Sequence, residues 1–479
     1  MPLSHGLFRN YDIRGEYGKE LTEDAVFLIA RGYAAYTHAA RVVIGYDARS
    51  SSPSLCDAAV KGLVESGISV TDIGMVSTDV LYFAAWHGGF DGGIMITASH
   101  MPKQYNGMKF LRLDENGVLA PIGRGLGMEE LEHAANVAEE AQAAGGKSER
   151  KEAGANRIAQ IVAQQKETGA VEQADIWNEY AAFVRSFVDV SAIGPLSVVM
   201  DAGNGMGGVV AEKVYAGMNL STTKLFFEPD GTFPNHDPNP IIPKNREDII
   251  AKVKEVGADL GVAWDADCDR CYFIDERGEF VNGDFITALL AKHFLEKNPG
   301  AGVVYDVRSS WAVQKTIDRF GGRGYRARVG HTFIKPKMRD TNSIFGGEMS
   351  GHYYFADNKF MDNGFIPSLI VMEMLGKSGK KVSELISELG SFFVSGEINF
   401  EVIEPVQDVL ARIEAHYAGK ASAIDKLDGV SVEFPEWHCN VRPSANDPVV
   451  RLNLEAKSKA LLQEKLEEVS GLIGGKQAE

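Results

Sequence analysis

The sequence predicts an α/β protein with three similar mixed α/β domains, followed by a smaller C-terminal α+β domain that has an antiparallel sheet. Three short apolar runs rich in β-branched residues each end at an aspartate, and they lie at 41–47, 196–201 and 302–306. Such runs are typical of buried parallel strands. A helical pattern follows each run, and this alternation calls for mainly parallel sheets covered by helices. From Ser395 the pattern changes, which predicts the fourth domain.

The three α/β segments repeat one order of elements, which makes a weak internal repeat. The expected helices are 54–67, 209–217 and 311–322. The polar loops that follow are 96–107, 263–270 and 346–355, and the second strand-like runs are 108–113, 271–275 and 352–357. Because ligands of open α/β sheets bind beyond the carboxyl ends of the strands, all three loops are candidate site loops.

The C-terminal segment combines strand-like runs with two helical patterns. The strands are expected at 395–402, 429–434, 437–441 and 449–456, and the helices at 405–419 and 458–473. Helices on one face of an antiparallel sheet make a small α+β domain. Residues 129–175, rich in Ala, Glu, Gln and Lys, are expected to be helical, exposed and linker-like. The domain prediction is therefore 1–140, a helical linker or insert at 141–174, then 175–280, 281–393 and 394–479.

The bulk composition excludes several classes of protein. With 479 residues, 44% hydrophobic and 24% charged, the chain is expected to be globular. A formal net charge of −17 argues against nucleic acid or an anionic membrane as the main partner. The start has no signal-peptide pattern, and no apolar run reaches about 18 residues. The four cysteines are few for this length and fit a reducing cytoplasm. The pair Cys268 and Cys271 is a weak zinc signal, and Cys271 is expected in the core.

The loop at 263–270 carries Asp265, Asp267 and Asp269, which alternate at the end of a predicted strand. Three carboxylates this close repel one another unless a cation lies among them, and oxygen ligands select Mg²⁺ or Ca²⁺. An EF-hand is the rival, with Glu276 at the twelfth position. It fails because Arg270 stands where glycine is needed and strands flank the loop. A solvated acidic turn is the alternative without function.

The loop at 96–107 places Ser99 beside His100, with Lys109 ten residues beyond the serine. A serine next to a histidine suggests nucleophilic catalysis. Sequence neighbours do not normally point at each other, so His100 need not be the base for Ser99. A Ser-His dipeptide by itself is usually part of an ordinary turn. A phosphoserine that faces three aspartates would need a divalent cation to neutralise both sides.

Two further loops have the chemistry of sugar and phosphate recognition. In 346–352, Glu348 and Ser350 supply acceptors and a donor suited to sugar hydroxyls. In 441–451, guanidinium groups and small donors match a phosphate dianion, and these residues are Arg442, Ser444, Asn446 and Arg451. A glycine-rich turn and a surface β-turn are the respective alternatives.

A glycine pattern after the strand at 196–201 supports a different hypothesis. Gly203, Gly205 and Gly208 form G-x-G-x-x-G, and Glu228 lies 20 residues beyond the last glycine. This is the outline of a dinucleotide fingerprint and predicts a nicotinamide-dependent oxidoreductase. The pattern is short and gives many false positives, and the hypothesis leaves the aspartates and the Ser99 loop unexplained.

Six stretches together resemble the α-D-phosphohexomutases, and most closely the bacterial phosphomannomutase and phosphomannomutase/phosphoglucomutase branch. They occur in the family's order over nearly the whole chain, at 11–15, 97–109, 265–270, 330–335, 346–352 and 442–456. The resemblance implies four domains around a central cleft and a hexose phosphate as substrate. It also implies a cytoplasmic enzyme, monomer or homodimer, that binds neither nucleic acid nor membrane.

The resemblance assigns roles residue by residue. Ser99 would be phosphorylated and, with Asp265, Asp267 and Asp269, would hold Mg²⁺. Charge would be stabilised or shuttled by Arg14, His100, Lys109 and Arg270. The sugar would be read by Glu348 and Ser350, with Tyr11, Arg308 and His331 nearby. The phosphate that is not reacting would be held by Arg442, Ser444, Asn446 and Arg451.

The implied reaction converts hexose 6-phosphate and hexose 1-phosphate into each other, for mannose, glucose or both. It runs through phospho-Ser99 and a hexose 1,6-bisphosphate, which is both intermediate and activator. The chain departs from the family pattern at Met101, Ala266, Ala445 and Asn446. A relative that binds hexose phosphates with weak or no turnover is therefore the alternative.

Overall fold

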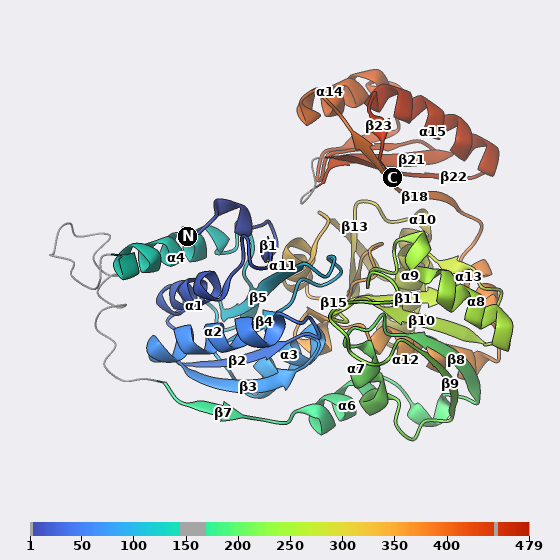
Figure 1. Ribbon diagram of the computed structural model, residues 1–479. Coiled ribbons are helices and arrows are strands. Elements are labelled where there is room, and N and C mark those ends of the chain that lie inside the picture. Colours follow the sequence, from blue (N-terminus) through green and yellow to red (C-terminus); the bar gives the residue numbers. More distant parts are fainter. Residues whose placement is uncertain (1–2, 144–168, 445–448, 479) are drawn as a thin grey trace. The chain divides into compact units, whose positions relative to one another are not determined.

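The computed structural model of the protein describes residues 3–143, 169–444 and 449–478. These form two compact units (Figure 1). The first unit comprises Met1–Glu279 and Met361–Ser378, and the second comprises Phe280–Phe360 and Gly379–Glu479. The chain therefore leaves the first unit and later returns to it for one short segment. Among the described helices, none is long and apolar enough to cross a lipid bilayer.

The first sheet of the first unit has the strand order β1-β5-β4-β2-β3-β7, with β6 beside β5. The strands are β1 (Ile13–Glu16), β2 (Arg41–Tyr46), β3 (Ser69–Met75), β4 (Gly92–Ile96), β5 (Tyr105–Leu113), β6 (Leu119–Pro121) and β7 (Val171–Gln173). The apolar strand β2 pairs in parallel with β3 and β4, whereas β5 pairs antiparallel with β1, β4 and β6. Its helices are α1 (Glu23–Thr37), α2 (Ser52–Glu65), α3 (Thr78–His87) and α4 (Met128–Ala143).

Helix α4 corrects one expectation, because it packs along α1. Leu131 and Ala135 of α4 are fully buried. A Cβ atom on Gly32 of α1 would lie 2.5 Å from the Ala135 nitrogen, so only glycine allows this close approach. The expectation of an exposed segment is wrong for residues 129–143. It is also wrong that 171–173 is helical, since β7 pairs with β3. The middle of the expected linker, 144–168, lies outside the described residues.

The second sheet of the first unit is built on β8 (Leu196–Asp201), which pairs in parallel with β9 (Leu220–Leu225) and β10 (Leu260–Trp264). β11 (Cys271–Ile274) pairs antiparallel with β10, and Cys271 is fully buried, as predicted. The helices here are α6 (Trp177–Arg185), α7 (Gly207–Val214) and α8 (Glu247–Val256). Strand β10 ends directly before Asp265, so the sheet places the aspartate loop at its carboxyl edge.

The returning segment consists of β17 (Met361–Asp362) and α12 (Ile366–Ser378). Trp264 of β10 is fully buried, and its ring stacks on Phe365 with the centroids 4.7 Å apart. The Trp264 indole N–H also donates to the Gly364 carbonyl at 2.9 Å. The last residues of the first unit therefore cover the strand that leads to the aspartate loop.

The glycine pattern at 203–208 has a packing explanation. A Cβ atom on Gly205 would lie 2.6 Å from the Ala266 Cα, and one on Gly208 would lie 2.1 Å from the Phe227 carbonyl oxygen. Both glycines are needed because main chain passes main chain at these points. Close packing beside the aspartate loop accounts for them without a dinucleotide.

The second unit begins with β12 (Phe280–Val281) and contains a third sheet. In it β13 (Gly302–Asp306) pairs in parallel with β14 (Arg323–Ala327) and β15 (Ser343–Gly347), and β15 pairs antiparallel with β16 (Tyr353–Phe355). The helices are α9 (Gly283–Lys297), α10 (Trp311–Arg319), α11 (His331–Asp340) and α13 (Val382–Ser387). The three α/β sheets confirm the predicted repeat.

The C-terminal sheet has the strand order β19-β20-β21-β22-β18-β23, and neighbouring strands in this order pair antiparallel. Its strands are β18 (Phe393–Glu401), β19 (Ala423–Asp425), β20 (Val430–Glu433), β21 (Trp437–Pro443), β22 (Val450–Ala456) and β23 (Lys476–Gln477). Helices α14 (Val406–Tyr417) and α15 (Lys459–Ile473) supply apolar residues to the same core. This confirms the predicted α+β domain.

Candidate functional site

Ser99 lies in the loop after β4, and its backbone adopts the left-handed region with φ 49°. Thr97 Oγ1 accepts a hydrogen bond from the Ser99 amide at 2.8 Å and donates to Asp47 Oδ2 at 2.7 Å. The Ser99 side chain is buried, and its Oγ donates to Asp265 Oδ2 at 2.9 Å. The loop therefore directs this hydroxyl at the first carboxylate of the aspartate loop.

A buried arginine that the sequence did not single out holds the Ser99 loop. The Arg49 guanidinium donates to four main-chain carbonyls, at 2.5 Å for Ser99, 2.6 Å for Met101, 3.0 Å for Pro102 and 2.9 Å for Tyr105. Burial lowers the pKa of Arg49 from its ordinary value. In the sequence this residue follows Asp47 by two positions and has no feature that separates it from a surface arginine.

The three aspartates converge as their spacing predicts. Asp265, Asp267 and Asp269 are buried, and each offers a carboxylate oxygen within 4.8 Å of the other two. Lys109 Nζ donates to Asp267 Oδ2 at 2.6 Å and also to Asp269. Burial, reinforced by Asp269 and Asp267, raises the pKa of Asp265 well above its ordinary value. The electrostatic conflict inferred from the sequence is thus present in the folded chain.

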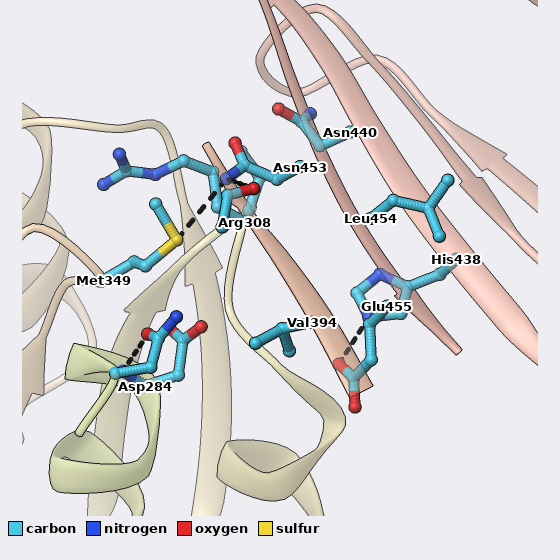
Figure 2. A pocket seen from close by; sticks show the side chains of 12 residues that line it. Asp284, Arg308, Met349, Val394, His438, Asn440, Asn453, Leu454 and Glu455 are labelled. Carbon is cyan, nitrogen blue, oxygen red and sulfur yellow. Dashed lines mark hydrogen bonds and ion pairs between the residues drawn. The ribbon is translucent and has the colours of Figure 1, made fainter. Parts of the chain in front are cut away.

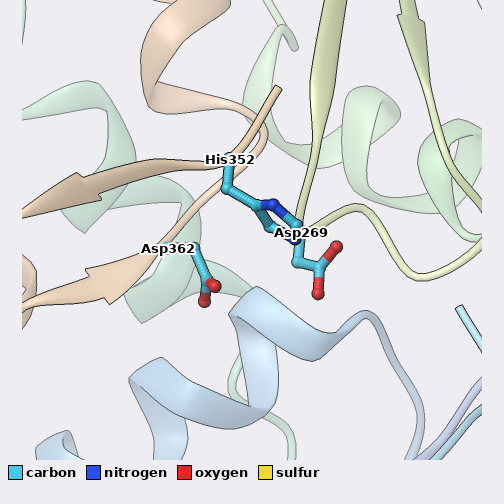
Figure 3. A group of neighbouring side chains, drawn as sticks. All are labelled: Asp269, His352 and Asp362. Atoms are coloured by element: carbon cyan, nitrogen blue, oxygen red, sulfur yellow. The ribbon is translucent and has the colours of Figure 1, made fainter. Parts of the chain in front are cut away.

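The residues of this cluster fit a hard divalent cation. Asp267 Oδ1 is buried and has no hydrogen-bond partner among the described residues. Thr78 Oγ1 donates to the other oxygen, Asp267 Oδ2, at 2.6 Å, which orients the carboxylate. Asp362, at the end of β17, is not one of this group of three, but it places a carboxylate oxygen within 4.8 Å of one of Asp269 (Figure 3). The donor set is oxygen alone, which suits Mg²⁺.

Two cationic side chains, Arg270 and Arg14, lie near the same cluster. Arg270 Nε lies 3.6 Å from Asp265 Oδ2. Arg14 of β1 donates to both oxygens of Asp12, at 2.9 and 2.6 Å, and its Nη1 is buried without a partner among the described residues. Burial opposes the charge on Arg14, but Asp12 raises its pKa overall. Tyr11, half-buried, lies just before β1.

His100 approaches Ser99, although side chains of adjacent residues seldom meet. The Ser99 Oγ and His100 Nδ1 atoms are 3.3 Å apart, because the left-handed backbone at Ser99 turns the two side chains together. Burial, with the charges of Arg270 and Arg14, holds the pKa of His100 well below its ordinary value. The imidazole ring is therefore neutral near pH 7.

Arg308 follows β13 in the second unit and contacts another predicted residue, Glu348. Arg308 forms two hydrogen bonds with Asp306, Nε to Oδ1 at 3.0 Å and Nη2 to Oδ2 at 2.9 Å. Its Nη2 also lies 3.5 Å from Glu348 Oε2. Glu348 accepts from the Gly330 amide at 3.1 Å and from the Tyr354 hydroxyl. These contacts fix the Glu348 carboxylate in place.

The two remaining predicted sugar contacts lie on neighbouring segments. His331 is the first residue of α11. The Ser350 Oγ lies 3.1 Å from the His352 Nδ1 within the same unit.

The predicted phosphate loop begins at the end of β21. Arg442 and Arg451 lie opposite each other on β21 and β22. The Ser444 amide donates to the Val449 carbonyl at 2.8 Å. The predicted contact Asn446 and the departure Ala445 lie outside the described residues.

A carboxylate that sequence reasoning missed links three of these arginines. Glu397 of β18 lies 3.1 Å from Arg308, 2.8 Å from Arg442 and 3.0 Å from Arg451, measured from carboxylate oxygen to guanidinium nitrogen. Burial opposes ionisation of Glu397, but Arg308, Arg451 and Arg442 outweigh it and hold the pKa at about 2. In the sequence Glu397 falls in an alternating strand pattern, where a glutamate is normally a surface residue.

Arg308 also lines a small pocket of the second unit, together with residues of α9 and the C-terminal sheet (Figure 2). Asp284 of α9 is buried there, and burial raises its pKa well above the ordinary value. On the sheet side, Asn453 Nδ2 donates to the Met349 Sδ at 3.4 Å. The His438 Nε2 lies 2.9 Å from Glu455 Oε2. Polar side chains thus line the pocket beside Arg308.

Four family models match the chain in order. Their descriptions are phosphoglucomutase/phosphomannomutase alpha/beta/alpha domain I at 5–122, domain II at 178–278, domain III at 282–392 and the C-terminal domain at 397–472.

Relatives of known name match over nearly the full length. A phosphomannomutase of Salmonella typhimurium (strain LT2) is 40% identical over 463 residues, which cover 95% of this chain and 96% of that protein. A protein of Xanthomonas campestris pv. campestris named phosphohexose mutases is 38% identical over 470 residues, which cover 98% of this chain and 99% of that protein. A crystal structure of a phosphoglucomutase/phosphomannomutase family protein from Burkholderia thailandensis aligns with a TM-score of 0.82 at 30% identity and covers 99% of both chains.

Proposed function

The chain belongs to the phosphoglucomutase/phosphomannomutase family, and we propose that it is a phosphohexomutase that interconverts hexose 6-phosphate and hexose 1-phosphate. The sugar is mannose, glucose or both. The phosphoryl group passes through phospho-Ser99 and a hexose 1,6-bisphosphate. One observation carries the proposal: the buried Ser99 hydroxyl donates to Asp265 inside a cluster of three aspartates and Lys109.

The first unit holds the reacting end of the substrate in this proposal. Asp265, Asp267, Asp269 and the Ser99 side chain would hold Mg²⁺, which when bound neutralises the charge of the transferring phosphoryl group. Lys109 keeps its positive charge, because Asp267 and Asp269 raise its pKa well above the ordinary value although burial opposes this. It therefore acts on the phosphoryl oxygens as a charge and a donor.

The proposed chemistry consists of two phosphoryl transfers. In the first, the bond between phosphorus and the Ser99 Oγ breaks, and phosphorus bonds to a free hydroxyl oxygen of the hexose monophosphate. The proton of that hydroxyl passes to His100, whose Nδ1 lies 3.3 Å from the Ser99 Oγ. In the second, the other phosphoryl group of the bisphosphate returns to the Ser99 Oγ, and the sugar oxygen takes the proton back. Positioning and charge supply most of the catalysis.

We propose that the second unit binds the part of the substrate that is not reacting. Glu348 and Ser350 would contact sugar hydroxyls, with Arg308, His331 and, from the first unit, Tyr11 as further contacts. Arg442, Ser444, Asn446 and Arg451 would bind the second phosphate. The domain limits of 1–140, 141–174, 175–280, 281–393 and 394–479 belong to the same proposal.

Two departures from the family pattern leave the required groups in place. Met101 contributes its main-chain carbonyl to Arg49 at 2.6 Å. Ala266 contributes its carbonyl to the Met206 amide at 2.8 Å. A different side chain at either position leaves these main-chain contacts available. Neither departure removes a group that the proposed mechanism needs.

A mutase assay with Ser99→Ala tests the proposal. Mannose 1-phosphate and glucose 1-phosphate are supplied separately with Mg²⁺ and a trace of the matching 1,6-bisphosphate. We expect turnover by the wild type and a loss of at least about 10³-fold in the variant, because the variant lacks the hydroxyl that carries the phosphoryl group in this mechanism. The ratio of the two wild-type rates identifies the preferred sugar.

Ser191→Ala is a matched control, since the hydroxyl of this exposed serine donates to the neighbouring Asp189. It should keep the wild-type rate. If the phosphorylated wild type binds both sugar phosphates and turns over neither, the chain is a binder and the mutase proposal is wrong.

A further inference from the structure

Among the described residues of the second unit, three arginines converge on the single carboxylate of Glu397. Arg308 and Arg442 are almost fully buried, with side chains 3% exposed, whereas Glu397 is 16% exposed. A buried or half-buried charge is stable only when it is paired. The cluster therefore depends on an anion at its centre.

Arg308 and Arg442 are not equally well paired with acceptors. Arg308 has a second carboxylate, Asp306, which it contacts through two hydrogen bonds. Arg442 donates to Glu397 at 2.8 Å and to the Pro443 carbonyl at 3.3 Å, and its Nε is buried with no partner among the described residues. Arg442 thus retains a donor that a larger anion could use.

The electrostatic environment of Arg442 also favours a larger anion. Burial lowers the pKa of Arg442, and the neighbouring charge of Arg308 lowers it further, while Glu397 acts in the opposite direction. Arg308 and Arg442 therefore repel one another, and at Arg442 the charge of Glu397 compensates this repulsion and the burial only in part. A phosphate dianion carries more charge than a carboxylate and offers more acceptor oxygens to guanidinium donors.

The backbone explains how Glu397 reaches the arginines. The register between β18 and β22 shifts between Val394 and Glu397, which leaves one extra residue in β18. Gly396 within this bulge has φ 70°, a conformation that favours glycine. A bulge re-aims the side chain that follows it and gives the strand a point of local adjustment.

We propose that Glu397 is a placeholder for the substrate's phosphate. Its carboxylate holds Arg308, Arg442 and Arg451 together while the site has no substrate, and the phosphate that is not reacting displaces it. This inference rests on the proposed function, which places a phosphate at Arg442 and Arg451. It adds a competitor that weakens phosphate binding and so allows the bisphosphate to release one phosphate and present the other.

The test is Glu397→Gln, which keeps the size of the side chain and removes its charge. Calorimetry measures the Kd of inorganic phosphate and of mannose 6-phosphate, and steady-state kinetics measures KM and kcat. If the carboxylate occupies the arginines most of the time, its removal should lower both Kd values about tenfold or more. KM should fall with them, and kcat should fall because the intermediate reorients more slowly.

Two further variants separate competition from loss of structure. Glu397→Asp keeps the charge but reaches the arginines less well, so it should give a smaller gain in affinity; it carries the test if Glu397→Gln does not fold. Glu404→Gln is the matched control, because Glu404 pairs with Arg412 at 2.9 and 2.6 Å elsewhere in the same domain. It should leave both Kd values unchanged.

The outcomes distinguish this inference from the proposed function. Phosphate binding that Glu397→Gln leaves unchanged or weakens, in a chain where Arg442→Lys weakens it, would contradict the placeholder alone. If the wild type does not bind mannose 6-phosphate, or if Arg442→Lys binds it normally, the phosphate site itself is misplaced and the placeholder fails with it.

Discussion

At the scale of single residues, the candidate site depends on side chains that never need to touch a substrate. Arg49 fixes the Ser99 loop through main-chain carbonyls, and Thr78 orients Asp267. Thr78 is fully buried, and its amide also donates to the Asp267 carbonyl at 2.9 Å. Such supporting contacts set the geometry of metal ligands and commonly change metal affinity 10- to 100-fold when removed, so about tenfold is a cautious expectation here.

We therefore predict that Thr78→Val weakens Mg²⁺ binding about tenfold. The valine keeps the shape of the side chain and loses only the hydroxyl that donates to Asp267. A Mg²⁺ titration of activity should show a higher half-saturating concentration, with the rate largely recovered at saturating Mg²⁺. Thr37→Val, which removes a hydroxyl bond to the Tyr33 carbonyl in α1, serves as the control. An unchanged Mg²⁺ titration would show that Thr78 does not position the carboxylate.

The sequence predicts residues of this site only where the chemistry is local. The aspartates, Ser99 and Lys109 stand out by spacing and type, and the structure brings them together. Arg49 and Glu397 do not stand out, because the loop carbonyls that Arg49 holds are 50 or more residues away and the arginines that Glu397 contacts are 45 or more residues away. A buried arginine and a buried glutamate look like surface residues until the fold supplies their partners.

At the scale of secondary structure, the strands were predictable because each is a short apolar run before a polar loop. The helix at 129–143 was predictable too, but the burial of one of its faces was not, since its alanines and glutamates resemble a solvated helix. Small residues are also what a close helix pair requires. In the folded chain, α1 and α4 approach so closely that Gly32 has no room for a side chain.

Gly32→Ala should therefore destabilise the first unit by about 1–3 kcal/mol, because the new methyl group would meet the Ala135 main chain. Thermal unfolding should show a lower melting temperature. Gly471→Ala in α15 has open space around it and should instead stabilise the protein by about 0.5–1 kcal/mol. Equal effects of the two substitutions would mean that helix propensity, not the close contact, decides the result.

At the scale of the whole molecule, the division into two units does not follow the order of the chain. The sequence predicts successive domains, but Met361–Ser378 belongs to the first unit while residues on both sides of it belong to the second. No local pattern predicts this return, because α12 is apolar over most of its surface and could cover many sheets. Contacts made only in the folded chain hold it there, among them the stacking of Phe365 on Trp264 and the hydrogen bond of Tyr215 with Ser368.

Phe365→Ala should thus weaken the first unit by about 3–5 kcal/mol, although the residue lies far along the chain. Hydrogen exchange should show lost protection in β8 and β10 and unchanged protection in β20 to β22. Phe400→Ala, at a buried position of the C-terminal core, should give the reverse pattern. Loss of protection in both units from either substitution would mean that the two unfold as one cooperative body.

The returning segment also orders events during synthesis. The first unit is not complete at residue 279, because it needs 361–378. At about 5–20 residues per second, the ribosome makes residues 280–378 in roughly 5–20 s. During that interval, the apolar surface around Trp264 stays exposed, because the segment 361–378 that covers it has not yet been made. The strand that leads to the aspartate loop is therefore among the last parts of the first unit to be sealed from water.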